Sequence, residues 1–345
     1  MKCTTRKTQP EGIQMNILRS FSSFLLAAGF GVLCAAPTVA QEQQTVNVIL
    51  DWAWRPHHAP FAVGIQRGFF ADEGIDLKVE QGRGSATAAT LLGQGQFDIA
   101  HINVTNAAQA ISKGVPIKSI AVYQTRSAAA FIGVKGRVQL DSVEALRPLR
   151  IGSTPGGSDG LSLSVFARAN GLTVQDFNVV GMEGSGKTTA LLQDQVDVVS
   201  GDSYAYDALV RAAGEKPEIM LLADFGVPLM GFGFATNETF AAEHPDIIPG
   251  FLRAAHRSYA AAVEDPEGAC EILRTTYEVP GTNEACVAYF MNLVDLSQSP
   301  DDPQWGVQSA EAWDALVGAL QEVGEIGADL SPADFWTNDF QPTEN

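Results

Sequence analysis

The chain has 345 residues, of which 46% are hydrophobic, so it can bury a sizeable core and form two domains or lobes. It carries 40 acidic and 22 basic residues, a formal net charge of −18. Such a surface repels nucleic acid and anionic lipid, which argues against those partners and favours a soluble carrier.

The first 40 residues are predicted to be a secretory signal peptide. Residues 21–33 form an apolar run that is too short for a stable membrane anchor, and Arg19 precedes it. Small residues follow up to Ala40, so we expect cleavage near Ala40–Gln41 and a periplasmic product. Leu33 stands directly before Cys34, where a lipid-attachment site requires a small residue, which disfavours a lipoprotein.

After the signal, strand-like apolar runs alternate with helix-like stretches. We expect strands at 46–50, 75–79, 97–101, 117–122 and 129–134, and helices at 59–67, 85–92 and 104–112. The pattern restarts with strands at 149–152, 177–180, 196–200, 219–222 and 232–235, and helices at 161–170, 188–193 and 204–212. The C-terminal third is predicted to be wholly helical. This alternation predicts mainly parallel sheets flanked by helices on both faces.

The two halves of this pattern resemble each other. Residues 82–98 and 184–197 each contain a glycine-rich turn, a helix with paired leucines, a polar turn and a strand carrying one Asp. We therefore predict two α/β lobes: a discontinuous first lobe of residues 41–134 and 232–345, and a second lobe of residues 135–231. The cleft between such lobes faces strand C-termini and helix N-termini, where α/β sheets bind ligands.

The loop 51–58 after the first strand is the strongest local signal. Trp52 and Trp54 could stack on a planar ligand, and His58 could donate to its polar edge, as could the nearby Arg55. The simpler alternative is that one tryptophan fills the core and the other residues decorate a loop. We expect at least one of the aromatic rings and His58 to face the cleft, with Asp51 also in the ligand site.

Residues 181–188 match the phosphate-binding pattern GxxxxGK[ST] of nucleotide hydrolases, and they follow a strand and open a helix. Export from the cytoplasm, the lack of an apolar strand ending in a magnesium-binding acid, and a similar glycine turn without lysine in the first half all count against that function. The favoured interpretation is a helix N-terminus that touches ligand through backbone N–H groups and Ser185.

Further candidate ligand residues follow other predicted strands. Ser158 and Asp159 open a helix, and each could be its N-cap or contact a ligand. Asp202, Tyr204 and Tyr206 follow the strand at 196–200, and Asn103 occupies the corresponding position of the first lobe.

We predict no metal ion, cofactor or catalytic residue. His57, His58 and His101 could meet at a metal, but nothing in their spacing requires it. No nucleophile–base pair or acid pair is recognisable. Cys270 and Cys286 could form a disulfide in an oxidising compartment, or could be two separate buried residues.

Several short motifs resemble the solute-binding family that includes receptors for thiamine-pyrimidine precursors, riboflavin, sulfonates and nitrate. These are Leu50-Asp51-Trp52 with His58 seven residues after the Asp, Gly68-Phe69-Phe70, and the segments 73–76, 92–98 and 114–117. The resemblance implies a type II periplasmic-binding fold that closes around one small molecule and presents it to a membrane permease. The Asp-Trp…His opening is closest to the pyrimidine-precursor branch.

The sequence thus predicts a monomeric, non-enzymatic substrate-binding component of an ABC importer. Its expected ligand is a small planar heteroaromatic solute such as a thiamine-pyrimidine precursor. Two alternatives stay open: the same receptor for a sulfonate, nitrate or other small anion, centred on Arg55 and helix N-termini, and a P-loop nucleotide hydrolase.

Overall fold

The computed structural model describes residues 43–154 and 158–342. The predicted signal peptide and residues 155–157 lie outside these ranges. Residues 41–345 form one compact unit. Within the described residues, no helix is long and apolar enough to cross a membrane.

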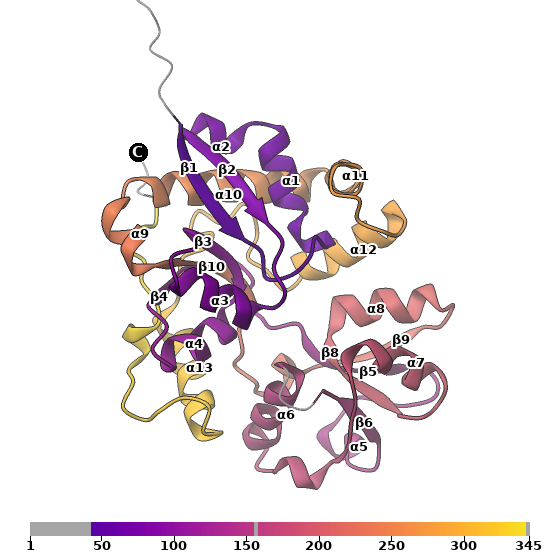
Figure 1. Cartoon of the computed structure of the whole chain (residues 1–345). Helices are drawn as coiled ribbons and strands as arrows, with labels where there is room; N and C mark the ends of the chain where they lie inside the picture. The colour runs from indigo at the N-terminus through magenta and orange to yellow at the C-terminus, as the bar shows by residue number, and fades with distance from the viewer. Residues whose placement is uncertain (1–42, 155–157, 343–345) are drawn as a thin grey trace, which may run out of the picture. The chain divides into compact units, whose positions relative to one another are not determined.

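The first sheet has five strands in the order β2-β1-β3-β10-β4. They are β1 (Gln44–Ile49), β2 (Ile75–Glu80), β3 (Ile99–Asn103), β4 (Ile117–Val122) and β10 (Phe232–Asn237). The strand β1 pairs in parallel with β2 and β3, whereas β10 is antiparallel to both β3 and β4. The predicted strands are all present, and β10 joins this sheet after the chain has passed through the second one (Figure 1).

The second sheet repeats this arrangement with the order β7-β6-β8-β5-β9. Its strands are β5 (Ala129–Val134), β6 (Arg150–Ser153), β7 (Asn178–Gly181), β8 (Val198–Asp202) and β9 (Pro217–Leu221). Here β5 is the single antiparallel strand, between β8 and β9. Both sheets are therefore mixed, with one antiparallel strand inserted into an otherwise parallel sheet, and the two predicted α/β lobes have the same strand order.

One predicted boundary differs from the structure. We assigned residues 129–134 to the first lobe, but β5 pairs with β8 and β9 of the second sheet. The chain thus crosses between the sheets at 123–128, before β5, and not after residue 134. Every residue of β5 is buried, and an apolar strand of this kind fits either sheet equally well, so periodicity carries no information about its partners.

The two crossing segments are hydrogen-bonded to each other. The backbone N–H of Gln124 donates to the carbonyl of Phe232 at 3.0 Å, and Gly231 donates back to the carbonyl of Gln124 at 2.9 Å. The Gln124 side chain accepts a further bond from the Phe232 N–H. A Cβ on residue 231 would lie 2.2 Å from this side chain, so the crossing requires glycine there.

Helices cover the sheets, and the C-terminal third is helical as predicted. The helices of the first part are α1 (Ala59–Gln66), α2 (Phe69–Asp72), α3 (Ser85–Gly93) and α4 (Val104–Ser112). Those of the second are α5 (Val143–Leu146), α6 (Ser158–Ala169), α7 (Lys187–Leu192) and α8 (Ser203–Ala212). The C-terminal helices are α9 (Glu238–Glu243), α10 (Ile247–Glu264), α11 (Pro266–Thr276), α12 (Asn283–Val294) and α13 (Ala310–Glu322).

Two C-terminal helices contact elements of the second sheet. The helix α12 lies beside α8 (Figure 1), where the Asn292 amide donates to the Asp207 carboxylate at 3.4 Å. The helix α13 buries Trp313 in the same hydrophobic core as Phe131 and Phe166. A disulfide between Cys270 and Cys286 joins α11 to α12, which resolves the pairing that the sequence left open. The C-terminal helices therefore connect both lobes.

Candidate ligand cavity and its histidine–carboxylate network

A cavity of about 360 Å³ is lined by residues of both lobes. It lies at the C-terminal ends of β1, β3, β6 and β8, where the loops leave the sheets. Eight predicted site residues line it: Asp51, Trp52, Asn103, Ser158, Asp159, Asp202, Tyr204 and Tyr206. The volume falls within the range of small-molecule sites. Direct ligand contact by these residues remains a prediction.

Three predicted site residues do not line the cavity. Trp54 is buried and stacks on Tyr277 with ring centroids 3.8 Å apart. His58 is fully buried beneath the cavity wall, because the helical turn η1 (Pro56–His58) directs it inward. Ser185 is exposed to solvent outside the cavity. The predictions for Trp54, His58 and Ser185 as cavity residues were therefore wrong, since loop direction is set by tertiary packing.

The structure adds cavity residues that we had not predicted. His57, rather than His58, lines the cavity, and Lys187 of α7 lines it as well. Tyr289 reaches the cavity from α12, and Phe232 from the start of β10. The GxxxxGK[ST] pattern at 181–188 contains Lys187 and is a sequence signal that could have identified it as a cavity residue. Nothing in the helical pattern around Tyr289 distinguishes it from an ordinary core residue.

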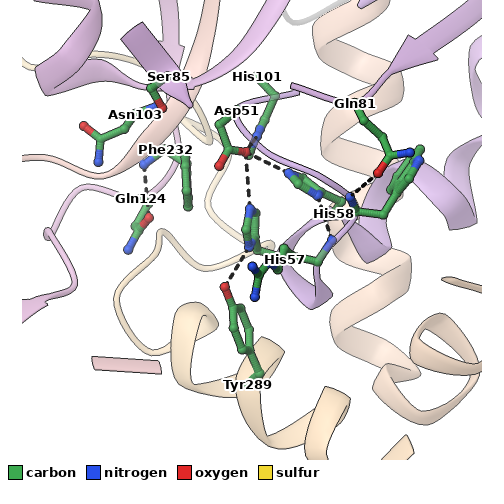
Figure 2. A network of polar contacts seen from close by, with 12 residues as sticks. Asp51, His57, His58, Gln81, Ser85, His101, Asn103, Gln124, Phe232 and Tyr289 are labelled. Atoms are coloured by element: carbon green, nitrogen blue, oxygen red, sulfur yellow. Dashed lines mark hydrogen bonds and ion pairs between the residues drawn. The ribbon is translucent and has the colours of Figure 1, made fainter. Parts of the chain in front are cut away.

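Three histidines converge on one carboxylate oxygen (Figure 2). The Oδ1 atom of Asp51 lies 2.7 Å from His58 Nε2, 3.0 Å from His101 Nδ1 and 3.2 Å from His57 Nε2. These residues come from the loop after β1 and from the middle of β3. All four are buried, so Asp51 gathers its partners just behind the cavity wall.

The second nitrogen of each ring also has a partner, and for His58 this partner fixes the position of the ring proton. The Arg55 backbone N–H lies 3.1 Å from His58 Nδ1 and can only donate, so His58 carries its proton on Nε2 and donates to Asp51. The Tyr289 hydroxyl lies 3.0 Å from His57 Nδ1, and the Tyr123 hydroxyl lies 2.7 Å from His101 Nε2. Three neutral imidazoles donating to an ionised Asp51 satisfy every one of these contacts.

The pKa shifts agree with this pattern. Burial, followed by the neighbouring His57, lowers the pKa of His58 to about 3 against the opposing pull of Asp51. Burial is also the main cause that lowers the pKa of His101. Burial alone would raise the pKa of Asp51, but the adjacent imidazoles hold it well below its usual value. Asp51 is therefore ionised, and His58 and His101 are neutral at pH 7.

Lys187 forms a second polar cluster on the opposite wall. Its ammonium group lies 2.7 Å from Asp159 Oδ2 and 2.8 Å from the carbonyl of Ser200, and the residue is only 3% exposed. Asp159 Oδ2 also accepts from the Thr154 N–H at 2.7 Å. A phosphate-binding lysine must be free to reach the nucleotide. This lysine is already paired, which argues against the P-loop alternative.

Aromatic rings and a third carboxyl complete the cavity. The rings of Tyr204 and Tyr289 lie 4.8 Å apart, and Tyr206 packs against Gly201, where a Cβ would lie 2.2 Å from the ring. Enclosure by the cavity walls raises the pKa of Asp202 to about 6, and the Asp51 carboxylate adds to this shift against the opposing effect of His57. The side chain is open to the cavity and is thus available to a ligand.

Comparison with known proteins supports a relationship over most of the chain. The formylaminopyrimidine-binding protein of Halalkalibacterium halodurans is 25% identical over 312 residues, which cover 88% of this chain and 94% of that protein. The riboflavin-binding protein RibY of Chloroflexus aurantiacus is 25% identical, covering 89% of each chain. A 4-amino-5-hydroxymethyl-2-methylpyrimidine phosphate synthase of Legionella pneumophila is 26% identical over 66% of this chain and 72% of its own length.

The fold is shared with solved solute receptors. The periplasmic aliphatic sulphonate binding protein SsuA of Escherichia coli matches 86% of this chain and 99% of its own, with a TM-score of 0.67 at 13% identity. This likeness identifies the fold as that of periplasmic binding proteins. The family model described as NMT1/THI5 like matches residues 55–269, more than half of the chain. The chain therefore belongs to the NMT1/THI5-like family.

Proposed function

We propose that the chain is the extracytoplasmic substrate-binding component of an ABC importer, and that it binds a small planar nitrogen heterocycle in the cavity. The observation that carries this proposal is the composition of the cavity wall, in which aromatic rings stand beside carboxylates contributed by both lobes. A thiamine-pyrimidine precursor is the solute class that this wall and the named relatives both favour.

The aromatic residues supply the apolar contact. Trp52 is 44% exposed although it lies at the cavity, so a large ring is left open for a partner. Tyr206 lines the opposite wall, on α8. When a planar ligand ring stacks on Trp52, the two ring faces that meet are both removed from water. We infer that Trp52 is the main stacking residue of the site.

The charges favour a ligand that donates hydrogen bonds over an anion. Asp51 and Asp202 both present carboxyl groups to the cavity, while Lys187 is neutralised by Asp159. Of the cations described at the cavity, Arg55 alone has no carboxylate partner. Amino groups on a pyrimidine would meet these carboxylates, whereas a sulfonate or nitrate would be repelled by them. The anion-binding alternative is therefore disfavoured.

Calorimetric titration of the protein from Gln41 onward tests the proposal. The panel contains formylaminopyrimidine, riboflavin, an alkanesulfonate, nitrate and ATP with magnesium. We expect saturable one-site binding of the pyrimidine, and weakening by at least tenfold in Trp52→Ala. Binding of only the sulfonate or nitrate would overturn the ligand class, and binding of only ATP would overturn the receptor role.

The cellular setting follows from the receptor role. We propose a periplasmic, monomeric protein whose partner is a cognate inner-membrane permease. Fractionation of cells that express the full chain should place the protein in the periplasmic extract, with an N-terminus near Gln41 by mass spectrometry. Light scattering should give the mass of one chain. Retention in the cytoplasm would contradict the proposal.

We further propose that the chain is not an enzyme, although several relatives are named as synthases. Within the described residues, both cysteines are joined in the disulfide and carry no free thiol. Mass spectrometry of the pyrimidine after incubation with the protein should recover it unchanged and the protein at its original mass. A stoichiometric change in either mass would contradict this proposal.

A further inference from the structure

Three of the five histidines in the chain lie around Asp51, in an arrangement that could hold a metal ion. One ligand-type atom from each of Asp51, His57, His58 and His101 lies within 4.8 Å of the others. Imidazole nitrogens with a carboxylate oxygen form the donor set of borderline divalent transition metals. Asp51, His57 and His58 belong to one loop, whereas His101 lies 50 residues beyond Asp51 in the chain, so the fold brings His101 to the other three.

The separations divide the four residues into two groups. Ligands held at about 2.0–2.2 Å in a tetrahedron lie roughly 3.3 Å from one another. The Asp51 Oδ1 atom lies 3.2 Å from His57 Nε2 and 3.0 Å from His101 Nδ1, close to this spacing. Its distance of 2.7 Å to His58 Nε2 is shorter and suits a direct hydrogen bond.

The hydrogen-bond partners make the same division. A metal-bound imidazole must donate its other ring N–H. His57 and His101 can do so, because their second nitrogens face the hydroxyls of Tyr289 and Tyr123, which can accept as well as donate. His58 cannot, because its Nδ1 faces the Arg55 backbone N–H. On metal binding, the imidazoles of His57 and His101 would stay neutral. Each would then carry its proton on the nitrogen that faces a tyrosine hydroxyl.

We propose that Asp51, His57 and His101 form a binding site for a borderline divalent transition metal ion such as Zn²⁺. His58 holds the carboxylate through its Nε2–H and is not a ligand. Asp51 and His57 also line the cavity, so the remaining coordination position is reached from the solute site. This site requires no bound solute, although it shares Asp51 with the proposed solute site.

The test measures metal bound to the protein from Gln41 onward after removal of metals with a chelator. We expect about one Zn²⁺ per chain by elemental analysis, saturable binding by calorimetry, and a visible absorption band with Co²⁺. In His101→Ala the affinity should fall by more than a hundredfold. His244→Ala removes a histidine outside the cluster and should leave stoichiometry and affinity unchanged.

The hydrogen-bonded network without metal is the competing outcome. Absence of stoichiometric Zn²⁺ and Co²⁺ binding by the unmodified protein would overturn the metal site, whatever the variants do. Equal loss in His244→Ala and His101→Ala would also overturn it, because the binding would then be non-specific. Repeating the pyrimidine titration in the presence of chelator separates the two proposals, since solute binding can survive the loss of the metal site.

Discussion

Acidification should destabilise the protein through His58, and the structure gives the sign. The pKa of His58 is about 3 in the folded protein, against an ordinary value of 6.5 when the chain unfolds. Below pH 6.5, His58 therefore binds a proton in the unfolded chain but stays unprotonated in the folded protein. The free energy of unfolding falls as pH drops, until the folded pKa is reached.

The size of the effect follows from the two pKa values. Between pH 7 and pH 4.5 the loss from His58 alone is about 2.5 kcal/mol. Since pH 4.5 lies well above the folded pKa, a shift of one unit in that pKa changes this figure little. Burial lowers the pKa of His101 as well, so its contribution has the same sign. Asp51, whose pKa is lowered, adds a further loss only at more acidic pH.

Urea unfolding of the chelator-treated protein, followed by tryptophan fluorescence at pH 7 and pH 4.5, measures the effect. The comparison is between the native protein, His58→Gln, and His244→Gln as a control outside the network. His58→Gln should be less stable at pH 7, but its further loss at pH 4.5 should be smaller than that of the native protein by about 2.5 kcal/mol. Equal losses in all three proteins would refute the neutral, buried His58 on which the network depends.

Substitutions at three further places test other parts of the structure. Lys187→Met should lower the free energy of unfolding by about 1–3 kcal/mol in urea, because it leaves the partly buried Asp159 carboxylate without its cation. Trp54→Ala should lower it by a similar amount, since its ring is buried, whereas Trp52→Ala should change solute affinity in calorimetry with little effect on unfolding. Replacing Cys270 and Cys286 by Ala should lower stability by about 3 kcal/mol, because the disulfide, which joins residues 16 apart in the chain, restricts the unfolded chain.

The strands and helices were predictable because their hydrophobic patterns are local. The predicted strand at 117–122 matches β4, and the predicted helix at 104–112 matches α4. Pattern does not determine which sheet a buried strand joins, so β5 was misplaced. That choice depends on the crossing segments near Gln124 and Phe232, whose contacts are more than one hundred residues apart in the chain.

Cavity-lining residues were predictable at the ends of strands, but not where the chain turns. Trp52, Asn103 and Asp202 follow strand ends and line the cavity, as expected from sheet geometry. His57 and His58 are adjacent on one short helical turn, so a small rotation decides which of them meets the cavity. Tyr289 belongs to a C-terminal helix whose position is set by packing on α8, which no local pattern describes.

The internal repeat separates residues of the fold from residues of the site. Asp98 accepts from the Asn47 backbone N–H at 2.7 Å, and Asp197 accepts from the Arg150 backbone N–H at the same distance. Each carboxylate lies just before one strand and ties it to the neighbouring parallel strand, β3 to β1 in the first sheet and β8 to β6 in the second, so the repeated Asp serves the fold.

The polar contacts at the cavity come from positions at which the two lobes have different residues. His101 in β3 and Ser200 in β8 are both the third residue of equivalent strands, yet one contacts Asp51 and the other accepts from Lys187 through its carbonyl. Two lobes with one strand order thus place an ionised carboxylate on one wall and a neutralised ion pair on the other. This asymmetry is what an oriented, single-ligand site requires, and it is why the substitutions that alter binding are expected at positions where the two lobes differ.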